Sequence, residues 1–179
     1  DRTQIRRLAT SVGELDILVN NAGIFEERDV AASDEAFRDR RVAVNLTATW
    51  TLVQALSPSL RARRGVVVNV ASDAAYLGYA NSSVYCACHG ALVGLTRALA
   101  VELGPEVCAL CICSGPVMTD MVRGIAHDQA FMDGMVGSTV MKRIADPEEI
   151  VPAVLFLVSD AASYMTGCTL TVDGGATAF

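Results

Sequence analysis

The sequence is poor in positive charge and has no long uninterrupted hydrophobic segment. Its 14 Lys and Arg residues stand against 20 Asp and Glu residues, which gives a net charge of −6. Nucleic-acid binding needs clustered positive charge, and the basic clusters Arg40–Arg41 and 61–64 are interpreted as solvated helix ends. No strongly apolar run approaches the roughly 18 to 20 residues that span a bilayer, and no signal peptide is recognisable. We expect a soluble, cytoplasmic protein that binds neither nucleic acid nor membrane.

The sequence also lacks a disulfide pattern, although it contains six cysteines. Most of them lie in segments expected to be apolar or helical, so reduced, buried thiols are expected. The alternative is a metal site that joins Cys86, Cys88 and His89 to Cys111 and Cys113. Zinc sites usually use Cys-x2–4-Cys pairs on turns, whereas a Cys-x-Cys pair on a strand only points two thiols to one face. We expect no metal.

Strand and helix signals alternate along the chain. Short apolar runs predict strands over 15–20, 65–71, 107–113 and 168–172, and helices are predicted over 3–11, from 35, over 40–63 with a possible kink at Pro58, over 84–103 and over 147–158. The strands are apolar on both faces, which predicts an α/β fold with a parallel sheet covered by helices on both sides. No repeat or linker interrupts residues 1–179, so one domain is expected.

Six short motifs stand at regular places in this pattern. They are Asn20-Asn21-Ala22-Gly23 after the first strand, Asn45 in the long helix, Ser72 at the end of the second strand, Tyr85 in the next helix, Ser114-Gly115-Pro116-Val117-x-Thr119 after the third strand, and Thr171-Val172-Asp173-Gly174-Gly175 near the end. Each motif is weak alone. Their order and spacing resemble the short-chain dehydrogenase/reductase family over essentially the whole chain. The similarity is to the branch of 3-oxoacyl carrier-protein reductases and glucose dehydrogenases.

The resemblance implies an oxidoreductase that interconverts an alcohol and a ketone by hydride transfer with NAD or NADP. It implies the C-terminal part of a doubly wound, Rossmann-like parallel sheet, and a homodimer or homotetramer formed through the helices around Asn45 and Tyr85. The segment 118–141 aligns with the family's substrate lid. Its apolar side chains would suit an apolar substrate or would only pack the core: Met118, Met121, Phe131, Met132 and Met135.

The resemblance also implies catalytic roles. Tyr85 would be the general acid that protonates the alkoxide left by hydride transfer, and the base in the reverse direction. Ser72 would hydrogen-bond the substrate oxygen, and Asn45 would hold a water in a proton relay. Taken alone, Ser72 is equally a capping serine, Tyr85 a half-buried aromatic residue, and Asn45 a buried amide that bonds the backbone.

Cofactor contacts are implied for residues that follow the strands. By resemblance they are Asn21, Ala22, Gly23, Tyr85, His89, Gly115, Val117 and Thr119. Asp173-Gly174-Gly175 is interpreted as a turn rather than a contact.

His89 stands where the family has lysine. Tyr85 and His89 are four residues apart and share one helix face, but a neutral imidazole carries no fixed charge near neutral pH. Its help to Tyr85 would be partial. The alternative is a surface or satisfied histidine in a site that has lost its chemistry.

The sequence lacks the Thr-Gly-x-x-x-Gly-x-Gly loop that holds the cofactor pyrophosphate in the family. Ser114 also replaces the usual proline before Gly115. We expect residues 1–179 to be a fragment without the N-terminal glycine-rich strands, with 15–20 as an apolar edge strand open to pairing. An impaired or inactive fragment that keeps only oligomerisation surfaces is the alternative function.

Overall fold

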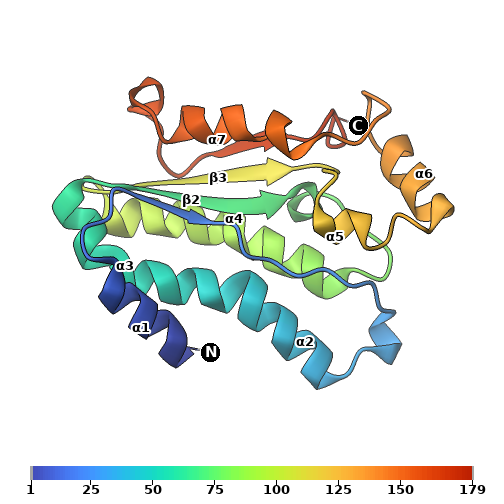
Figure 1. Ribbon diagram of the computed structural model, residues 1–179, viewed down its shortest axis with the longest axis horizontal. Coiled ribbons are helices and arrows are strands. Elements are labelled where there is room, and N and C mark those ends of the chain that lie inside the picture. The colour runs from blue at the N-terminus through green and yellow to red at the C-terminus, as the bar shows by residue number, and fades with distance from the viewer. Residues whose placement is uncertain (1, 179) are drawn as a thin grey trace.

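Four parallel strands form the centre of the molecule. The computed structural model describes residues 2–178. The sheet contains β1 (Ile17–Asn20), β2 (Val66–Ser72), β3 (Cys108–Ser114) and β4 (Thr169–Val172), in the order β1-β2-β3-β4. All three strand pairs are parallel, so the carboxyl ends lie at the same edge of the sheet (Figure 1). The predicted α/β fold with a parallel sheet is confirmed.

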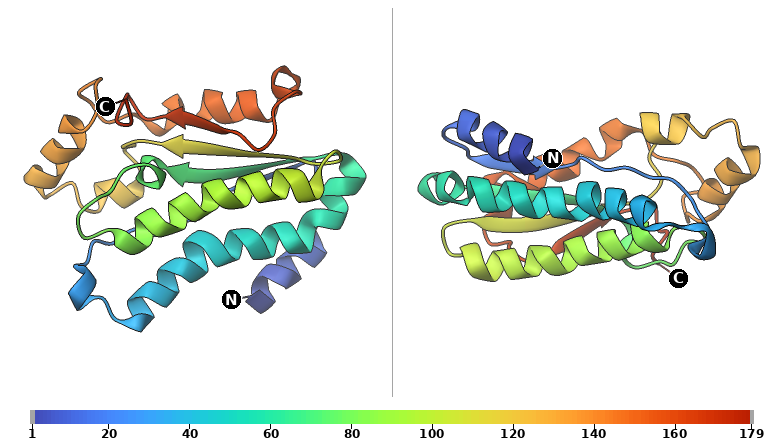
Figure 2. Two further views of the ribbon diagram at one scale, coloured as in Figure 1. Left: turned by 180° about the vertical axis from the view of Figure 1, so that it is seen from behind. Right: turned by 90° about the horizontal axis from the view of Figure 1, so that it is seen from below.

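Helices cover both faces of this sheet (Figure 2). The helices are α1 (Arg2–Val12), α2 (Glu35–Val42), α3 (Ala48–Arg63), α4 (Ser83–Leu103), α5 (Asp120–Arg123), α6 (Gln129–Gly137) and α7 (Val151–Leu157). Alternate strand residues face opposite ways. Val67 and Ala109 pack against α3 and α4, whereas Val68 and Leu110 pack against α7. The strands are apolar on both faces for this reason.

The long helix predicted over 40–63 is interrupted. A π-helical turn, Ala43–Thr47, separates α2 from α3, and the N–H of Ala48 donates to the carbonyl of Ala43. Such turns are rare and often lie at functional sites. Pro58 lies within α3 and does not end it. The helix predicted over 147–158 begins instead with a 3₁₀ turn, Pro147–Glu149, capped by Asp146, before α7 starts.

Helix α4 is the main apolar helix. By length and composition alone it could cross a membrane, although no strongly apolar run of that length was expected from the sequence. In the structure its Leu92, Val93 and Leu99 are buried, and it packs on β2 and β3. The same composition is expected of a core helix in a water-soluble protein.

A ladder of buried polar side chains connects this helix to the sheet. Asn20 Nδ2 donates to Asn69 Oδ1 at 2.9 Å, and Asn69 Nδ2 donates to Thr96 Oγ1 at 2.9 Å. The Thr96 hydroxyl in turn donates to the Leu92 carbonyl at 2.8 Å. The ladder joins β1, β2 and α4 through groups that would be costly to bury unpaired.

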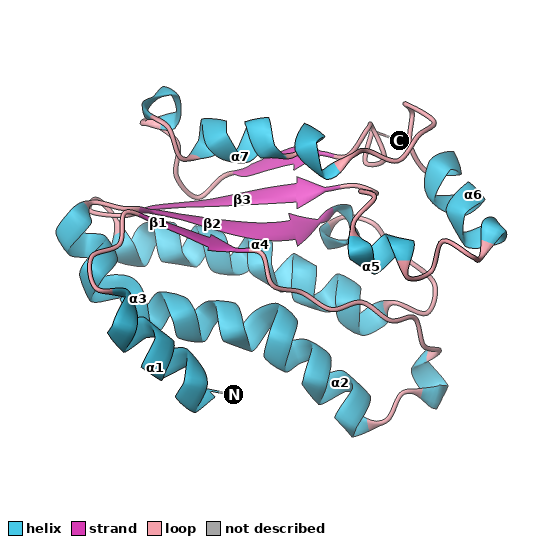
Figure 3. Ribbon diagram, in the orientation of Figure 1, coloured by secondary structure: helices cyan, strands magenta, loops and turns pink. Residues whose placement is uncertain are grey.

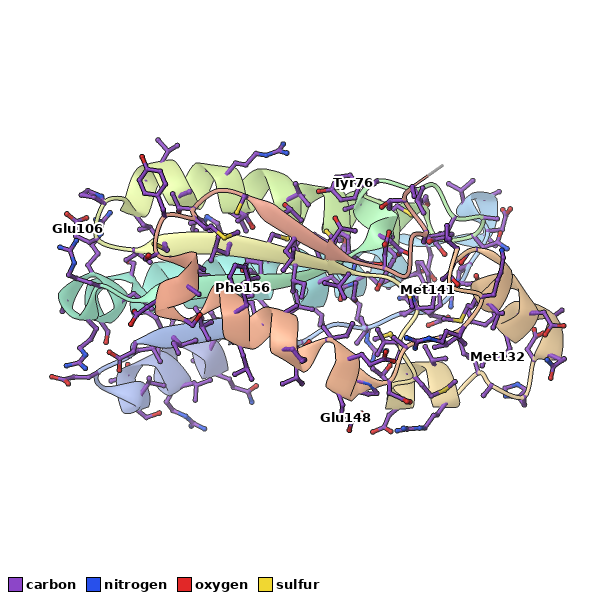
Figure 4. All side chains as sticks on the ribbon, turned by 90° about the horizontal axis from the view of Figure 1, so that it is seen from above. Tyr76, Glu106, Met132, Met141, Glu148 and Phe156 are labelled. Atoms are coloured by element: carbon purple, nitrogen blue, oxygen red, sulfur yellow. The ribbon has the colours of Figure 1, made fainter. Side chains whose placement is uncertain are left out.

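Strand β1 lies at the edge of the sheet, as predicted for 15–20. Its side chains Ile17 and Val19 are 43% and 42% exposed. Helix α1 packs beside it on α3. At the carboxyl edge, long loops carry α5 and α6 (Figure 3). Tyr76 and Met141 lie towards this edge, and Glu106 lies at the opposite end (Figure 4).

Candidate active site

The carboxyl edge of the sheet brings the predicted motifs together. In the register of the strands, Ser72 pairs with Ser114, and Ser114 pairs with Val172. Asn20 ends β1 opposite Asn69, so the loop that starts at Asn21 leaves the same edge. In open parallel sheets, ligands bind outside the carboxyl ends of the strands. The parallel pairing of the strands therefore places these segments around one candidate site.

Tyr85 lies in the first turn of α4, half-buried behind this edge. Its ring meets Phe25 edge to face, with 5.0 Å between the ring centroids. Burial raises the pKa of Tyr85 to about 12; the Ser72 hydroxyl lowers it, and the charge of Asp73 raises it further. The structure thus brings Tyr85 and Ser72 together, and it places no cation among the groups that shift the phenol.

His89 lies one turn further along α4 and is only 7% exposed. Its ring centroid is 4.1 Å from that of Tyr85, with 48° between the planes. Neither ring nitrogen has a hydrogen-bond partner among residues 2–178. Burial lowers the pKa of His89 to about 4, so the imidazole is neutral at pH 7. The interpretation of His89 as a surface or satisfied histidine is wrong, because the side chain is buried and unpaired.

Asn45 lies in the π turn with 2% exposure. Its Nδ2 donates to the Ile24 carbonyl at 3.0 Å, and its Oδ1 accepts from the Ile24 N–H at 2.8 Å. Both ends of the amide are therefore used on one backbone residue. This arrangement agrees with the alternative of a buried amide bonding the backbone. It also anchors the loop after β1, and the water-relay role stays a prediction.

Asp73 and Tyr79 are site residues that the sequence did not single out. Ser72 Oγ donates to Asp73 Oδ1 at 2.8 Å, and Tyr79 OH donates to Asp73 Oδ2 at 2.9 Å. The N–H of Ala74 donates to Ser72 Oγ at 3.2 Å, so Ser72 does cap a short turn as well. An acid directly after the strand-ending serine was the available signal.

The segments predicted to contact the cofactor differ in character. Asn21, Ala22 and Gly23 are exposed, whereas Asn20 of the same motif is buried and donates to Asn69. A Cβ on Gly115 would lie 2.7 Å from both Cα and O of Asp173, which gives this glycine a packing reason. Val117 forms a parallel bridge with Ala145, and Thr119 is exposed at the start of α5.

A cavity of about 230 Å³ lies between the loop after β1 and the lid. Of the five predicted lid residues, Met121 and Phe131 line it. Phe25 also lines it and contacts both Phe131 and Tyr85, so the Phe25 ring lies between the cavity and Tyr85. Its charged and polar lining consists of Glu26, Glu27, His127 and Asp128.

The cysteines do not assemble the alternative metal site. All six are free thiols, and Cys111 and Cys113 are fully buried on the α4 face of β3. Within residues 2–178 no three His, Cys, Asp or Glu side chains lie together in a way that could hold a metal ion.

Comparison with known proteins agrees with this geometry. The family model described as "Enoyl-(Acyl carrier protein) reductase" matches residues 2–177. The chain belongs to the short-chain dehydrogenase/reductase family. Members of this family are oxidoreductases that use NAD(P). The α/β architecture and the parallel sheet, predicted from the alternation of strands and helices, are confirmed. The family membership, predicted from the motifs, is also confirmed.

Individual relatives are longer than this chain. Nodulation protein G of Azospirillum brasilense is 37% identical over 97% of this chain and 71% of its own length. L-xylulose reductase of Bos taurus is 40% identical over 92% of this chain and 68% of its own. A gluconate 5-dehydrogenase from Burkholderia cenocepacia, solved with NADP and tartrate, superposes with a TM-score of 0.92 at 30% identity, covering 99% of this chain and 71% of that one.

Proposed function

We propose that this short-chain dehydrogenase/reductase chain carries the catalytic half of an NAD(P)-dependent oxidoreductase that interconverts an alcohol and a ketone. The observation that carries the proposal is the grouping at the carboxyl edge. There the Tyr85 phenol lies beside the Ser72 hydroxyl, and the tilted, buried His89 ring contacts the Tyr85 ring while neither of its nitrogens has a hydrogen-bond partner among residues 2–178. A tyrosine that only packed in the core would require neither the Ser72 hydroxyl nor the His89 imidazole beside it.

The chemistry follows from what each side chain can donate. When bound, NAD(P)H would supply the hydride. Tyr85 gives its phenolic proton to the oxygen that becomes an alkoxide, and takes it back during oxidation of the alcohol. Ser72 donates a hydrogen bond to the same oxygen and stabilises its developing charge. Asn45 fixes the loop after β1 through Ile24, which holds Phe25 against Tyr85.

The residues present fit the nicotinamide side of the cofactor. His89 is the test, because an orphaned buried imidazole is costly unless a partner arrives. A neutral imidazole has one donor and one acceptor nitrogen, which suits the hydroxyl groups of a ribose. Together with His89 and Tyr85, the residues that would hold the cofactor are Asn21, Ala22, Gly23, Gly115, Val117 and Thr119. The choice between NAD and NADP is left open by these residues.

For the pyrophosphate we propose a separate glycine-rich segment, because residues 1–179 have no glycine-rich strand–loop–helix. In this proposal the described domain works together with that segment as one folded unit. The relatives' greater length supports the proposal. The coding sequence upstream of Asp1 tests it directly.

The substrate proposal rests on the cavity beside Phe25. Phe25, Met121 and Phe131 give it an apolar wall, and three acidic residues lie among the remaining lining residues. We therefore expect a small ketone or alcohol with an apolar body and no negative charge. Carbonyl compounds matched in size but with and without a carboxylate test this expectation.

A second candidate function is a catalytically impaired member that only associates with its own kind. The observation in its favour is the phenol itself, whose pKa of about 12 is not lowered by any neighbouring cation. The helices that would form a homodimer or homotetramer are α3 and α4, which expose Trp50 at 48% and Val101 at 83%. A cytoplasmic location stays a prediction.

Two measurements separate the candidates. Oxidation of NADH or NADPH with a panel of ketones, with loss of activity in Tyr85→Phe, supports the enzyme. Silence towards both cofactors, in fluorescence as well as in turnover, supports the associating fragment. Light scattering on wild type, Trp50→Glu and Val101→Glu reports association. Val30→Glu is the matched control, because Val30 is 72% exposed on the 3₁₀ turn Val30–Ala32, which belongs to neither helix.

A further inference from the structure

Asp73 is a buried carboxylate that faces no cation. It is 4% exposed, and none of the ion pairs between the described residues includes it. Its two oxygens accept one hydroxyl each, from Ser72 at 2.8 Å and from Tyr79 at 2.9 Å. An acid is expensive to bury in this way, so its position directly beside a proposed catalytic serine calls for an explanation.

The hydroxyl of Ser72 has a single proton. While Asp73 is ionised it can only accept, and the hydroxyl of Ser72 donates its hydrogen bond to Asp73. The N–H of Ala74 occupies one lone pair of Ser72 Oγ at 3.2 Å. A substrate oxygen that arrives in this state would meet only the remaining lone pair, which repels it.

Protonation of Asp73 reverses the arrangement. A proton on Oδ1 donates to Ser72 Oγ, and the hydroxyl of Ser72 becomes free to donate elsewhere. Tyr79 still donates to Oδ2, so the carboxyl group keeps its place. Ser72 can then hydrogen-bond the substrate oxygen, as its proposed role requires.

We propose that Asp73 is a positioning residue whose protonation state sets the direction in which Ser72 donates its hydrogen bond, so that the site reduces ketones with Asp73 neutral. This inference rests on the function proposed above for Ser72 and Tyr85. The reduction itself is balanced without Asp73. Hydride adds to the carbonyl carbon, the π electrons become an alkoxide lone pair, and the proton of Tyr85 moves to that oxygen to leave a phenolate.

The surroundings of Asp73 raise its pKa. Burial is the largest cause and the negative charge of Asp173 adds to it, while hydrogen bonds from Ser72, Tyr79 and the backbone of Ala74 lower the pKa. The other titratable groups that sense Asp73 are Tyr79, Tyr85 and Cys113, and its negative charge raises the pKa of each. Ionised Asp73 therefore has two effects. It accepts the hydrogen bond of the Ser72 hydroxyl, and its negative charge makes the Tyr85 phenolate harder to form. Both effects disappear when Asp73 is protonated.

Two variants change this switch in different ways. In Asp73→Asn the amide can donate to Ser72 and accept from Tyr79, which imitates the protonated acid at every pH. In Tyr79→Phe the carboxylate loses a donor that stabilises its charged form, so its titration moves to higher pH. Asp160→Asn is the control, because Asp160 is exposed at the start of a short 3₁₀ turn.

The test uses nuclear magnetic resonance and needs no turnover. In wild type, the Asp73 Cγ, Ser72 Cβ and Tyr85 Cζ signals should share one midpoint above the usual Asp value of about 3.9. In Asp73→Asn the inflection should vanish at Ser72 and Tyr85. In Tyr79→Phe it should move upward at all remaining signals together, and Asp160→Asn should match wild type. Signals at Ser72 and Tyr85 that ignore the midpoint of Asp73 would overturn the proposal.

A kinetic arm tests the consequence for catalysis. Reductase kcat/KM should fall as pH rises through the midpoint of Asp73, and this limb should be absent in Asp73→Asn. A structural role alone would lower stability without moving the limb. If the protein oxidises no NAD(P)H at any pH, the proposed function fails, while the titration still decides whether Asp73 controls Ser72.

Discussion

The rings of Tyr85 and His89 are in tilted contact, with 4.1 Å between their centroids, and the imidazole has no hydrogen-bond partner among the described residues. This contact replaces a phenol–ammonium pair by a phenol beside a neutral ring. A neutral ring shields the phenol from water but does not stabilise its charge. The phenol is consequently a weak acid, with burial as the main cause.

Restoring a cation at position 89 should activate the phenol. In His89→Lys, the ammonium should lower the pKa of Tyr85 by about one to three pH units, as opposite charges do at close range. Absorbance titration of tyrosinate, with Tyr85→Phe subtracted, measures this change. His89→Gln is the neutral control and should leave the phenol weak. If turnover does not rise although the phenol has become more acidic, the limit lies in cofactor binding rather than at position 89.

Burial of neutral His89 should make folding sensitive to acid. Its pKa falls from 6.5 to about 4 on folding, so the folded state binds fewer protons than the unfolded chain between these values. The stability is complete above pH 6.5 and declines as pH falls towards 4, by about 3 kcal/mol at most. Urea unfolding of wild type and His89→Gln at several pH values measures it. Identical pH slopes in the two proteins would contradict the prediction.

The ladder Asn20–Asn69–Thr96 should be important for stability. Thr96→Val removes the hydroxyl and leaves the buried amide of Asn69 unpaired, at a cost of about 1–3 kcal/mol. Thr10 is a matched control, because its hydroxyl also bonds the carbonyl four residues earlier, Arg6, but at an exposed position. Thr10→Val should change the free energy of unfolding by less than about 0.5 kcal/mol. Denaturant titration of both variants compares them, and equal losses would rule out a special role for the ladder.

Gly115 should tolerate no side chain. The added methyl of Gly115→Ala would meet the Asp173 backbone at 2.7 Å, so β3 and the turn after β4 would have to separate. We expect a loss of more than about 1 kcal/mol of stability. Gly94→Ala is the control, since Gly94 is an exposed position of α4 and a Cβ added there would have nothing within 4 Å. Gly94→Ala should raise the stability of the protein by roughly 0.5–1 kcal/mol, because alanine favours a helix over glycine. Thermal unfolding should therefore shift in opposite directions in the two variants.

Much of the fold follows from local patterns. The apolar runs that became β2 and β3, and the start of a helix at residue 35, could be predicted because strand and helix preferences act over a few residues. Parallel pairing then brings Ser72 and Ser114 to one edge. The break between α2 and α3 could not be predicted, because a π turn changes the backbone hydrogen bonding without changing the apolar pattern of the sequence.

The candidate site divides in the same way. Tyr85 and His89 are four residues apart on one helix, so their shared face could be predicted from their spacing. It could not give the environment of the imidazole, because burial comes from neighbours that are distant in sequence. The structure shows that the Asn45 amide bonds the backbone of Ile24, in the loop after β1, and the water relay through Asn45 stays a prediction.

By itself the sequence determined the family, the order of strands and helices, and which residues meet at the carboxyl edge, since these depend on local pattern and on the geometry of parallel sheets. Only the tertiary structure decided which polar groups are paired. It left His89 buried without a hydrogen-bond partner in the described part of the chain, joined Asn20 to Asn69 and Thr96, and set Asp73 between Ser72 and Tyr79. Hydrogen bonding and desolvation depend on atoms a few ångströms apart in space, and no spacing along the chain specifies them.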